Sequence, residues 1–384
     1  VNPATVATTP AGDRTRTIGT PMSFEPGEPF RFVDSRLGLR ARPMRTDVVQ
    51  RIQISGVAGI PRRLTAISAN FTVVNQDRQG YLTAYDCTSS IPTVSTLNFV
   101  SGQAVANQAI IPLDDRGGLC LFTPANADIV IDVNGTFSAD AAGRLTSLNP
   151  FRAHDSRTSS AQPLRAGETR RIRIESRESG VPASATAAVV NLTAVRPDRN
   201  GWVRAIPCDQ RTTPTVSNLN AAADQVIANS AIVKLSASGE ICLQTNTTTD
   251  VIVDVTGYLS RTGMQFQAVE PVRLLDSRGG GRALDARMPA GDLSSIRVAG
   301  VGGLPSDAEA VSANLIAVSP TGPGFVTAWP CARADESPPT ASNLNHPTGR
   351  NVANGATVGL AGQGLCVYHR ASTHLVIDVT GIWR

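Results

Sequence analysis

The sequence predicts an all-β protein of three tandem antiparallel β-sandwich domains, of jelly-roll or Greek-key type, each with one disulfide inside the domain. Three observations lead to this fold class. One charged phrase recurs three times at a fixed interval, the apolar segments are short and rich in Val, Ile and Thr, and the six cysteines fall two to each copy. A chain of 384 residues is also long enough for about three domains.

The repeated phrase reads RFVDSR, RAHDSR and RLLDSR, and its aspartates, Asp34, Asp155 and Asp276, stand 121 residues apart. Further positions align on these aspartates: a G-[IVL]-P triplet, a G-[YWF] pair, an S-x-L-N segment and a closing D-V-x-G. A fixed interval of this length indicates one domain copied three times. The expected parts are an N-terminal arm and units 1, 2 and 3, with these boundaries: 1–21, 22–142, 143–263 and 264–384.

Each unit has the pattern of β structure. Apolar and polar residues alternate in RIQISGV, RRIRIES and GYLTAY, and Gly, Pro, Asn and Asp interrupt the chain roughly every 8–15 residues. No stretch carries a helical apolar stripe. The connections near 138–144 and 259–265 are short, so neighbouring units should pack closely, either as a stiff rod or as a pseudo-threefold cluster.

The cysteines indicate an oxidising compartment. Six cysteines allow fifteen pairings, but the repeat selects one bridge within each copy. Each bridge would stabilise its unit by about 3–4 kcal/mol. Zinc is a weak alternative, because two cysteines per copy without a shared histidine are too few ligands. The expected pairs place the protein outside the cell or on its surface: Cys87–Cys120, Cys208–Cys242 and Cys331–Cys366.

Charge and hydropathy argue against nucleic acid and membrane partners. The formal net charge is only +4, and the densest basic segment, TRRIRIESR, alternates with isoleucine and has no aromatic residues to stack bases. No run approaches the roughly 20 apolar residues that a membrane-spanning helix needs. The sequence starts at Val1 rather than Met, as expected of a mature form whose signal peptide has been removed.

These motifs together resemble a tandem repeat found in secreted proteins of actinobacteria, and they are similar to units in acidobacterial extracellular proteins. The resemblance covers nearly the whole chain through R-x-x-D-S-R, G-[VIL]-P, N-[LF]-T-x-V, S-x-L-N, [VI]-A-N and [VI]-x-[VI]-D-V-x-G. Unit 2 departs with AHDSR, where an apolar pair is usual, and unit 1 has YDC where the others have Pro before Cys. The resemblance implies an exported bacterial protein and no particular activity.

The recurring charged residues are candidates either for a site repeated three times or for structural ion pairs. Asp132, Asp254 and Asp378 interrupt otherwise apolar strands, and a buried carboxylate needs a partner such as the planar guanidinium fork. We expect that partner to be the arginine of the DSR phrase or the arginine three residues before the aspartate (Arg31, Arg152 and Arg273). The expected ion-pair residues are Asp34, Arg36, Asp132, Asp155, Arg157, Asp254, Asp276, Arg278 and Asp378.

The asparagines that recur in each copy have a structural interpretation. In unit 1 these are Asn70, Asn98 and Asn107, which lie beside turn residues and should bond backbone groups at bends and strand ends. Calcium is not expected, because Asp77 and Asp198 share a loop position but unit 3 has no acid there. No cofactor or metal is predicted.

Catalysis is not expected. No histidine position recurs in all three copies, no G-x-S-x-G motif has a strand and a helix around it, and the bridges leave no free thiol. A carboxylate pair of glycosidase type is the only catalytic arrangement left open, so a secreted hydrolase is the third alternative. The four histidines are His154, His346, His369 and His374.

Two non-catalytic functions remain. The first is a structural or assembly protein of the cell exterior whose arm, residues 1–21, adds a strand to a neighbouring subunit. The second is an adhesin- or lectin-like module that binds carbohydrate or cell-wall glycan, an inference by fold analogy. Functional sites are expected where the copies differ, at 156–164, 278–289 and 331–339.

Aromatic residues bear on the glycan alternative. Tyr81, Trp202 and Phe325 align between the copies and are expected in the core. Tyr368 and Trp383, both in unit 3, are therefore the aromatic side chains expected to serve a ligand.

Overall fold

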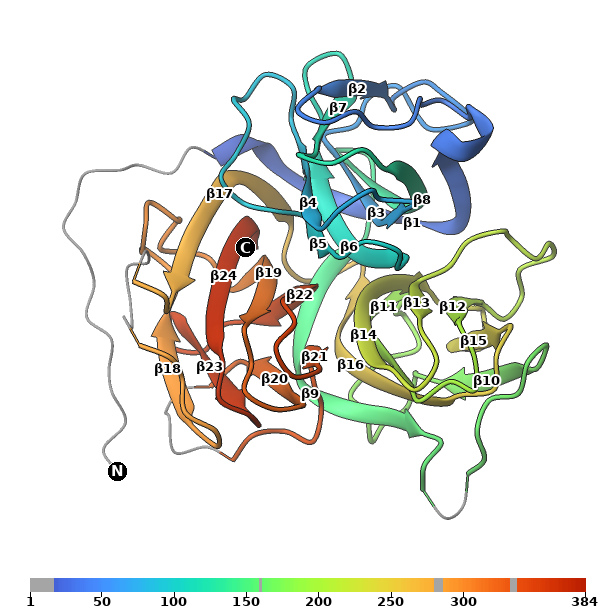
Figure 1. Ribbon diagram of the computed structural model, residues 1–384, viewed down its shortest axis with the longest axis vertical. Helices are drawn as coiled ribbons and strands as arrows, with labels where there is room; N and C mark the ends of the chain where they lie inside the picture. The colour runs from blue at the N-terminus through green and yellow to red at the C-terminus, as the bar shows by residue number, and fades with distance from the viewer. Residues whose placement is uncertain (1–16, 159–160, 280–285, 332–336) are drawn as a thin grey trace.

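The computed structural model describes residues 17–158, 161–279, 286–331 and 337–384 as three lobes around a common centre (Figure 1). Unit 1 is blue to teal, unit 2 green to yellow and unit 3 orange to red. The three units therefore form a pseudo-threefold cluster, and the rod is wrong. Within the described ranges no helix has the length and hydrophobicity needed to cross a membrane.

The strands follow the same order in each unit. Unit 1 contains β1 (Thr17–Asp34), η1 (Ser35–Leu37), β2 (Gln50–Gln53), β3 (Ala66–Val74), β4 (Gly80–Tyr85), β5 (Leu97–Phe99), β6 (Val105–Pro112), β7 (Gly118–Phe122) and β8 (Asp128–Ser138). Unit 2 contains β9 (Arg144–Asp155), β10 (Thr169–Arg173), β11 (Ala187–Val195), β12 (Gly201–Pro207), β13 (Leu219–Ala221), β14 (Val226–Lys234), β15 (Glu240–Thr245) and β16 (Asp250–Ser260). Unit 3 contains β17 (Phe266–Asp276), β18 (Leu293–Arg297), β19 (Ala310–Val318), β20 (Gly324–Trp329), β21 (Leu344–His346), β22 (Val352–Gly359), β23 (Gly364–His369) and β24 (His374–Trp383).

Every unit is a jelly roll of two antiparallel four-stranded sheets. The sheet that we call inner has the order β1-β8-β3-β6 in unit 1, β9-β16-β11-β14 in unit 2 and β17-β24-β19-β22 in unit 3. The outer sheets have the orders β2-β7-β4-β5, β10-β15-β12-β13 and β18-β23-β20-β21. Numbered within a unit, these are 1-8-3-6 and 2-7-4-5, the arrangement of a double-sheet jelly roll.

The inner sheets are buried on both faces, which explains their nearly continuous apolar sequences. In β8, Ile129, Ile131 and Val133 point into the sandwich core of unit 1. Val130 and Asp132 alternate with them and point away from that core, and both are buried. The second face of each inner sheet is covered by the neighbouring units.

A shared apolar cluster, which we call the central core, joins the three units. All of its buried members come from the inner sheets, and equivalent positions of the copies meet there. Phe137 contacts Phe24, Phe266 and Trp383, at ring-centroid distances of 4.9, 4.8 and 5.9 Å. The cluster contains Phe24, Ala66, Ile110, Phe137, Leu145, Ala187, Val189, Ile232, Leu259, Phe266, Ala268, Ala310 and Trp383.

The N-terminal segment closes the ring. β1 starts at Thr17, inside the arm expected from the sequence, and its first residues pair antiparallel with β17 of unit 3, for example Ile18 with Ala268. The same strand then pairs with β8 of unit 1, from Ser23 onward. Strand addition by the arm thus takes place within the chain for these residues, not with a neighbouring subunit. Residues 1–16 of the arm lie outside the described residues.

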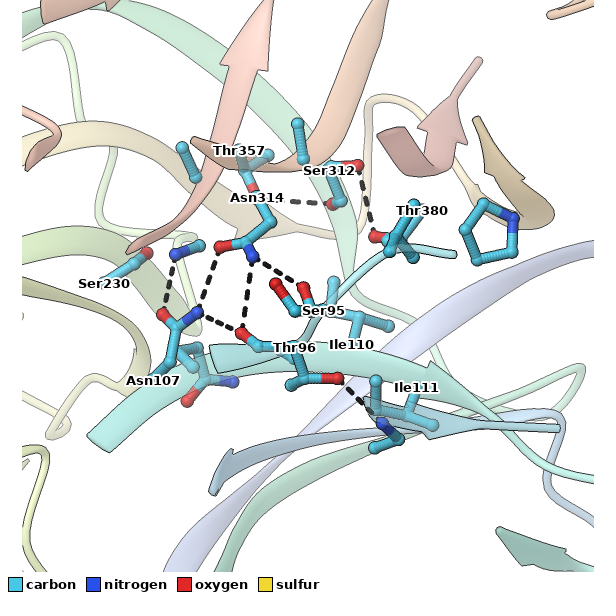
Figure 2. A pocket seen from close by; sticks show the side chains of 18 of the residues that line it. Ser95, Thr96, Asn107, Ile110, Ile111, Ser230, Ser312, Asn314, Thr357 and Thr380 are labelled. Carbon is cyan, nitrogen blue, oxygen red and sulfur yellow. Dashed lines mark hydrogen bonds between the residues drawn. The ribbon is translucent and has the colours of Figure 1, made fainter. Parts of the chain in front are cut away.

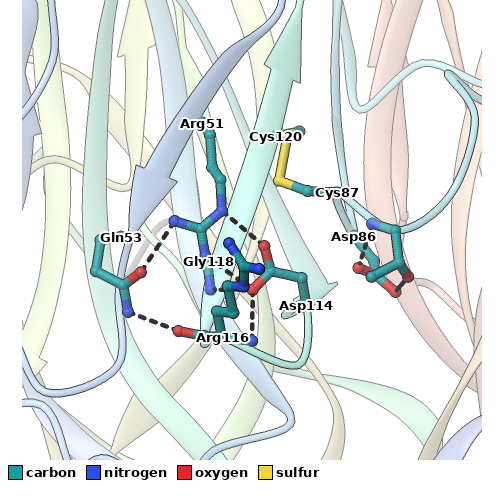
Figure 3. Close-up of a disulfide and its surroundings, with 9 residues drawn as sticks. Arg51, Gln53, Asp86, Cys87, Asp114, Arg116, Gly118 and Cys120 are labelled. Carbon is teal, nitrogen blue, oxygen red and sulfur yellow. Dashed lines mark hydrogen bonds and ion pairs between the residues drawn. A yellow bond between two sulfur atoms is a disulfide. The ribbon is translucent and has the colours of Figure 1, made fainter.

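The three predicted disulfides are present, one in each unit: Cys87–Cys120, Cys208–Cys242 and Cys331–Cys366. In unit 1 the bridge ties β7 to Cys87, two residues beyond the end of β4, so it clamps the outer sheet. Figure 3 shows this bridge beside Arg51, which donates to both oxygens of Asp114 at 2.7 and 2.9 Å. Each outer sheet therefore has a covalent clamp.

Candidate functional site

An ion-pair network forms at the end of the first strand of each unit. In unit 1, Arg31 donates to both oxygens of Asp132 at 2.8 and 3.2 Å and to Asp34 at 3.2 Å. Arg36 completes the network with bonds of 2.8 and 2.6 Å to the two oxygens of Asp34. The partner of the buried strand carboxylate is therefore the arginine three residues before the aspartate, and the DSR arginine pairs with the aspartate of its own phrase. Units 2 and 3 repeat the network with Arg152, Asp155, Arg157 and Asp254, and with Arg273, Asp276, Arg278 and Asp378.

The two carboxylates of each network have opposite pKa shifts. Hydrogen bonds from the DSR arginine lower the pKa of Asp34, Asp155 and Asp276, that of Asp155 to about 2. Burial instead raises the pKa of Asp132, Asp254 and Asp378, despite the arginine bonded to each. The charged form of Asp132, Asp254 and Asp378 therefore depends most on the arginine that is bonded to each.

Strand register explains why these side chains meet. Arg31 on β1 lies opposite Asp132 on β8, which lies opposite Asn70 on β3. Directly opposed residues of antiparallel strands share a face, so arginine, aspartate and asparagine form one polar row. This row lies on the face that meets the neighbouring unit. In unit 2 the row continues across the boundary, where Asp254 accepts the backbone N–H of Ser342 at 3.0 Å.

The asparagines of the polar rows connect the units in a cycle. Each donates its side-chain N–H to a backbone carbonyl in the S-x-L-N segment of the next unit, and the last unit returns to the first. The bonds run from Asn70 to Ser217 (2.6 Å), from Asn191 to Ser342 (2.5 Å) and from Asn314 to Ser95 (2.7 Å). The sequence predicted backbone bonding for Asn70, but these bonds cross between units instead of bracing a local bend.

A second set of asparagines protects the edges of the inner sheets. Asn107 on β6 donates to Thr96 and Asn314 beside a small cavity of about 50 Å³ (Figure 2). Its side-chain oxygen accepts the backbone N–H of Gly355 on β22 at 2.7 Å. Asn229 and Asn354 make the equivalent bonds. In each unit, therefore, a backbone N–H of the edge strand of the inner sheet donates to an asparagine side chain of the next unit. A Cβ at Gly355 would lie 2.2 Å from the carbonyl oxygen of Gln108, so only glycine fits there.

A surface groove, which we call groove 1–2, lies between units 1 and 2. Its volume is about 510 Å³, within the usual size of small-ligand sites. Its lining includes two arginines of the first ion-pair network, Arg31 and Arg36, together with Trp202 and Arg204 of β12. Equivalent residues of units 3 and 1, including Arg273, line a smaller groove of about 200 Å³.

The aromatic side chains occupy different places from those expected. Tyr81 is 37% exposed, and Trp202 and Phe325 are half-buried, so these aligned residues are not core residues. Trp202 lines groove 1–2, where the guanidinium of Arg204 stacks on its ring at 4.6 Å. The alternation of side chains along the strand could have predicted this position. Residues 202 and 204 share a face of the strand, and Arg204 is unsuited to a sandwich core.

Of the two aromatic residues expected to bind a ligand, Trp383 is wrong and Tyr368 stays a prediction. Trp383 is fully buried in the central core, and its indole N–H donates to Ser312 at 3.0 Å. It occupies the place of Phe137 and Leu259 in the other units, which explains its burial. Tyr368 is half-buried against Phe325 and the apolar surroundings of the Cys331–Cys366 bridge.

The remaining candidates do not gather into one site. In the part of the chain that the structure describes, no three His, Cys, Asp or Glu side chains are placed to hold a metal ion. Asp77 accepts two bonds from Asn126, and Asp198 accepts from Thr247 and Thr248, so each joins its loop to the loop before the last strand of its unit. Of the segments in which the copies differ, residues 159–160, 280–285 and 332–336 lie outside the described residues.

Two histidines of unit 3 are buried in the outer sheet, His346 on β21 and His369 on β23. Burial, with a smaller effect of His346, lowers the pKa of His369 to about 3. The ring nitrogens of His369 have no hydrogen-bond partner among the described residues. This side chain is therefore neutral in the folded protein over the whole physiological range.

We expect His369 to make the protein sensitive to acid. His369 takes up a proton near pH 6.5 in the unfolded chain and only near pH 3 in the folded chain. The free energy of unfolding therefore falls as the pH drops through this window. The cost at pH 5 is about 2 kcal/mol. His369→Thr, which installs the residue found at this position in units 1 and 2 (Thr123 and Thr245), should flatten the pH dependence in urea unfolding between pH 7.5 and 5. Equal slopes for both proteins would contradict this assignment.

Comparisons with known proteins identify no family for this chain. No family model matches the sequence, and no curated protein matches it. Among solved structures, the N-terminal CBM22-1–CBM22-2 tandem domain of Xyn10C from Paenibacillus barcinonensis is similar over 66% of this chain and 99% of that domain pair, at 10% identity and a TM-score of 0.19. A likeness at that TM-score carries no argument about fold or function.

Proposed function

We propose that this chain is a non-catalytic extracellular protein, a preassembled structural block of the bacterial cell exterior. The observation that carries the proposal is the closure of the ring, in which asparagine bonds run from unit 1 to unit 2, to unit 3 and back to unit 1. The central core joins the same three units, and the β1–β17 pairing joins units 1 and 3. A single chain thus builds one closed, rigid body from its three units.

Two further features support this proposal. The three disulfides suit an oxidising compartment outside the cell. The recurring charged residues are bonded to one another in structural networks, which accounts for their repetition without a catalytic role.

Size-exclusion chromatography with light scattering and limited proteolysis test the structural proposal together. We expect a monomer that resists cleavage between its units, at 139–143 and 261–265, because the ring closes within one chain. Deletion of residues 1–21 should leave the oligomeric state unchanged and lower the melting temperature, since β1 then loses its pairing with β17. A full-length oligomer that the deletion dissociates would instead support assembly through the arm, and rapid cutting between units would contradict a rigid block.

Binding of a saccharide is the second candidate function, and groove 1–2 is the observation that favours it. The groove combines the indole of Trp202 with hydroxyl and amide side chains of Thr213, Thr215 and Asn220. An aromatic surface surrounded by a few polar groups is the usual composition of a small-ligand site. Calorimetric titration with neutral and acidic oligosaccharides tests this candidate, and a Trp202→Ala variant that binds as well as the original chain would remove it.

A further inference from the structure

Groove 1–2 differs from its counterparts by one cation. Arg204 stands where units 1 and 3 have Thr83 and Thr327. Those threonines donate to the carbonyl oxygens of Val94 and Ala341 within their own units, at 3.0 and 2.7 Å. Arg204 makes a comparable bond, from Nη1 to the carbonyl of Pro214, and still has a charged group in the groove. The two threonines show that the fold at this position does not require arginine.

The charge of Arg204 is not neutralised within the described chain. The residue is 8% exposed, and its only other hydrogen bond to a residue that the structure describes goes from Nε to Gln244 at 2.8 Å. No carboxylate among the described residues forms an ion pair with it, and burial alone lowers its pKa. A guanidinium this deeply buried is ordinarily paired with an anion. Its Nη2 group, with two donor hydrogens, has no hydrogen-bond partner in the described ranges.

The surroundings of Arg204 favour an anion. Arg36 lies on the unit 1 side of the groove, 40% exposed, with its Nη1 group making no hydrogen bond within the described residues. Arg31 also lines the groove, whereas no acidic side chain does. The carboxylates of the network, Asp34 and Asp132, are buried and bonded to Arg31 and Arg36. Two guanidinium groups with free N–H donors therefore line the groove from opposite units, and guanidinium is the side-chain group best suited to bind a carboxylate.

We propose that groove 1–2 binds a carboxylate-bearing saccharide, with its carboxylate between Arg204 and Arg36 and a sugar ring against Trp202. The proposal rests on the second candidate function and adds the charge of the ligand. The groove has room for a short oligosaccharide, and its threonine hydroxyls and the amide of Asn220 offer donors and acceptors to sugar hydroxyls. The smaller groove between units 3 and 1 has Thr83 in place of the arginine, so one acidic site per chain is expected.

Calorimetric titration with trigalacturonic acid and with its neutral methyl ester tests the proposal on the full chain. We expect the acid to bind with a stoichiometry of one, and the ester to bind at least about tenfold more weakly. Arg204→Thr should weaken binding of the acid at least about tenfold and leave binding of the ester unchanged. The matched control is Arg171→Thr, which removes the same charge from an exposed site on β10. Its binding should equal that of the original chain, and all three proteins should melt at similar temperatures.

The other outcomes separate the two hypotheses. If the ester binds as tightly as the acid and Arg204→Thr changes neither, saccharide binding stands and the proposed selectivity for acid is overturned. If acetate or inorganic phosphate competes as strongly as trigalacturonic acid, the groove is an anion site without saccharide recognition, and the proposal is again overturned. If neither saccharide binds at millimolar concentration, both the proposal and the second candidate function fail.

Discussion

Replacing Arg152 with methionine is expected to lower the free energy of unfolding by about 3–5 kcal/mol at pH 7, because it leaves a buried carboxylate without its cation. Asp254 is fully buried and receives two hydrogen bonds from Arg152, at 2.8 and 3.2 Å. Arg152 also donates to Asp155 and, across the unit boundary, to the carbonyl of Thr340 at 2.6 Å. Urea unfolding followed by circular dichroism measures the loss.

The loss should depend on pH and on position. Burial already raises the pKa of Asp254, so the folded variant gains more from protonation of this group than the unfolded chain does. The difference in free energy of unfolding between the original chain and Arg152→Met should therefore become smaller as the pH falls from 7 towards 4. Arg157→Met is the matched control, because Arg157 is 44% exposed and Asp155 would keep Arg152 as its partner. A loss for Arg157→Met as large as that for Arg152→Met would show that burial does not decide the effect.

Truncation of Phe137 to alanine should also cost about 3–5 kcal/mol, and its effect should reach unit 3. Phe137 belongs to unit 1, but its ring packs at 4.8 Å on Phe266 and at 5.9 Å on Trp383, both of unit 3. The cavity would open at the junction and not inside one sandwich. Hydrogen–deuterium exchange should show faster exchange of the amides of β17 and β24, in addition to those of β8.

Phe71→Ala provides the comparison for this junction. Phe71 is as deeply buried as Phe137, but its ring belongs to the sandwich core of unit 1 alone. Its truncation should destabilise unit 1 by a similar amount, and the amides of β17 and β24 should exchange no faster than in the original chain. If both variants loosened only unit 1, the central core would not couple the units.

Much of the fold could be predicted from the sequence because the three copies restrict the alternatives. Each copy contains two cysteines at recurring positions, so the repeat alone selected the pairs seen in the structure, such as Cys87–Cys120. The buried carboxylates were predicted to need arginine partners, and the structure provides them through Arg31, Arg152 and Arg273. These predictions depend on local chemistry that every copy repeats.

Contacts between the units could not be predicted in the same way. An apolar residue on the second face of β8, such as Val130, indicates burial but does not say which unit covers it. Trp383 was expected to be free to serve a ligand. Its alignment with Phe137 and Leu259 pointed instead to a core position that is apolar in every copy.

Groove 1–2 was missed for a related reason. Trp202 aligns with aromatic residues in the other units, and alignment alone suggested packing. The neighbouring pattern is more informative, because Thr83, Arg204 and Thr327 occupy the position two residues later and therefore the same face of the strand. The groove itself depends on how units 1 and 2 meet, which no single copy of the repeat encodes.

Small-angle X-ray scattering of the purified chain tests most directly the claim that the three units close into a ring. A compact body of this length should have a radius of gyration of about 21 Å. Three sandwiches of about 120 residues joined end to end would instead give more than about 30 Å. A value near the first figure, with a single-peaked distance distribution, is the result expected here, and a value near the second would contradict the central core and the cycle of asparagine bonds.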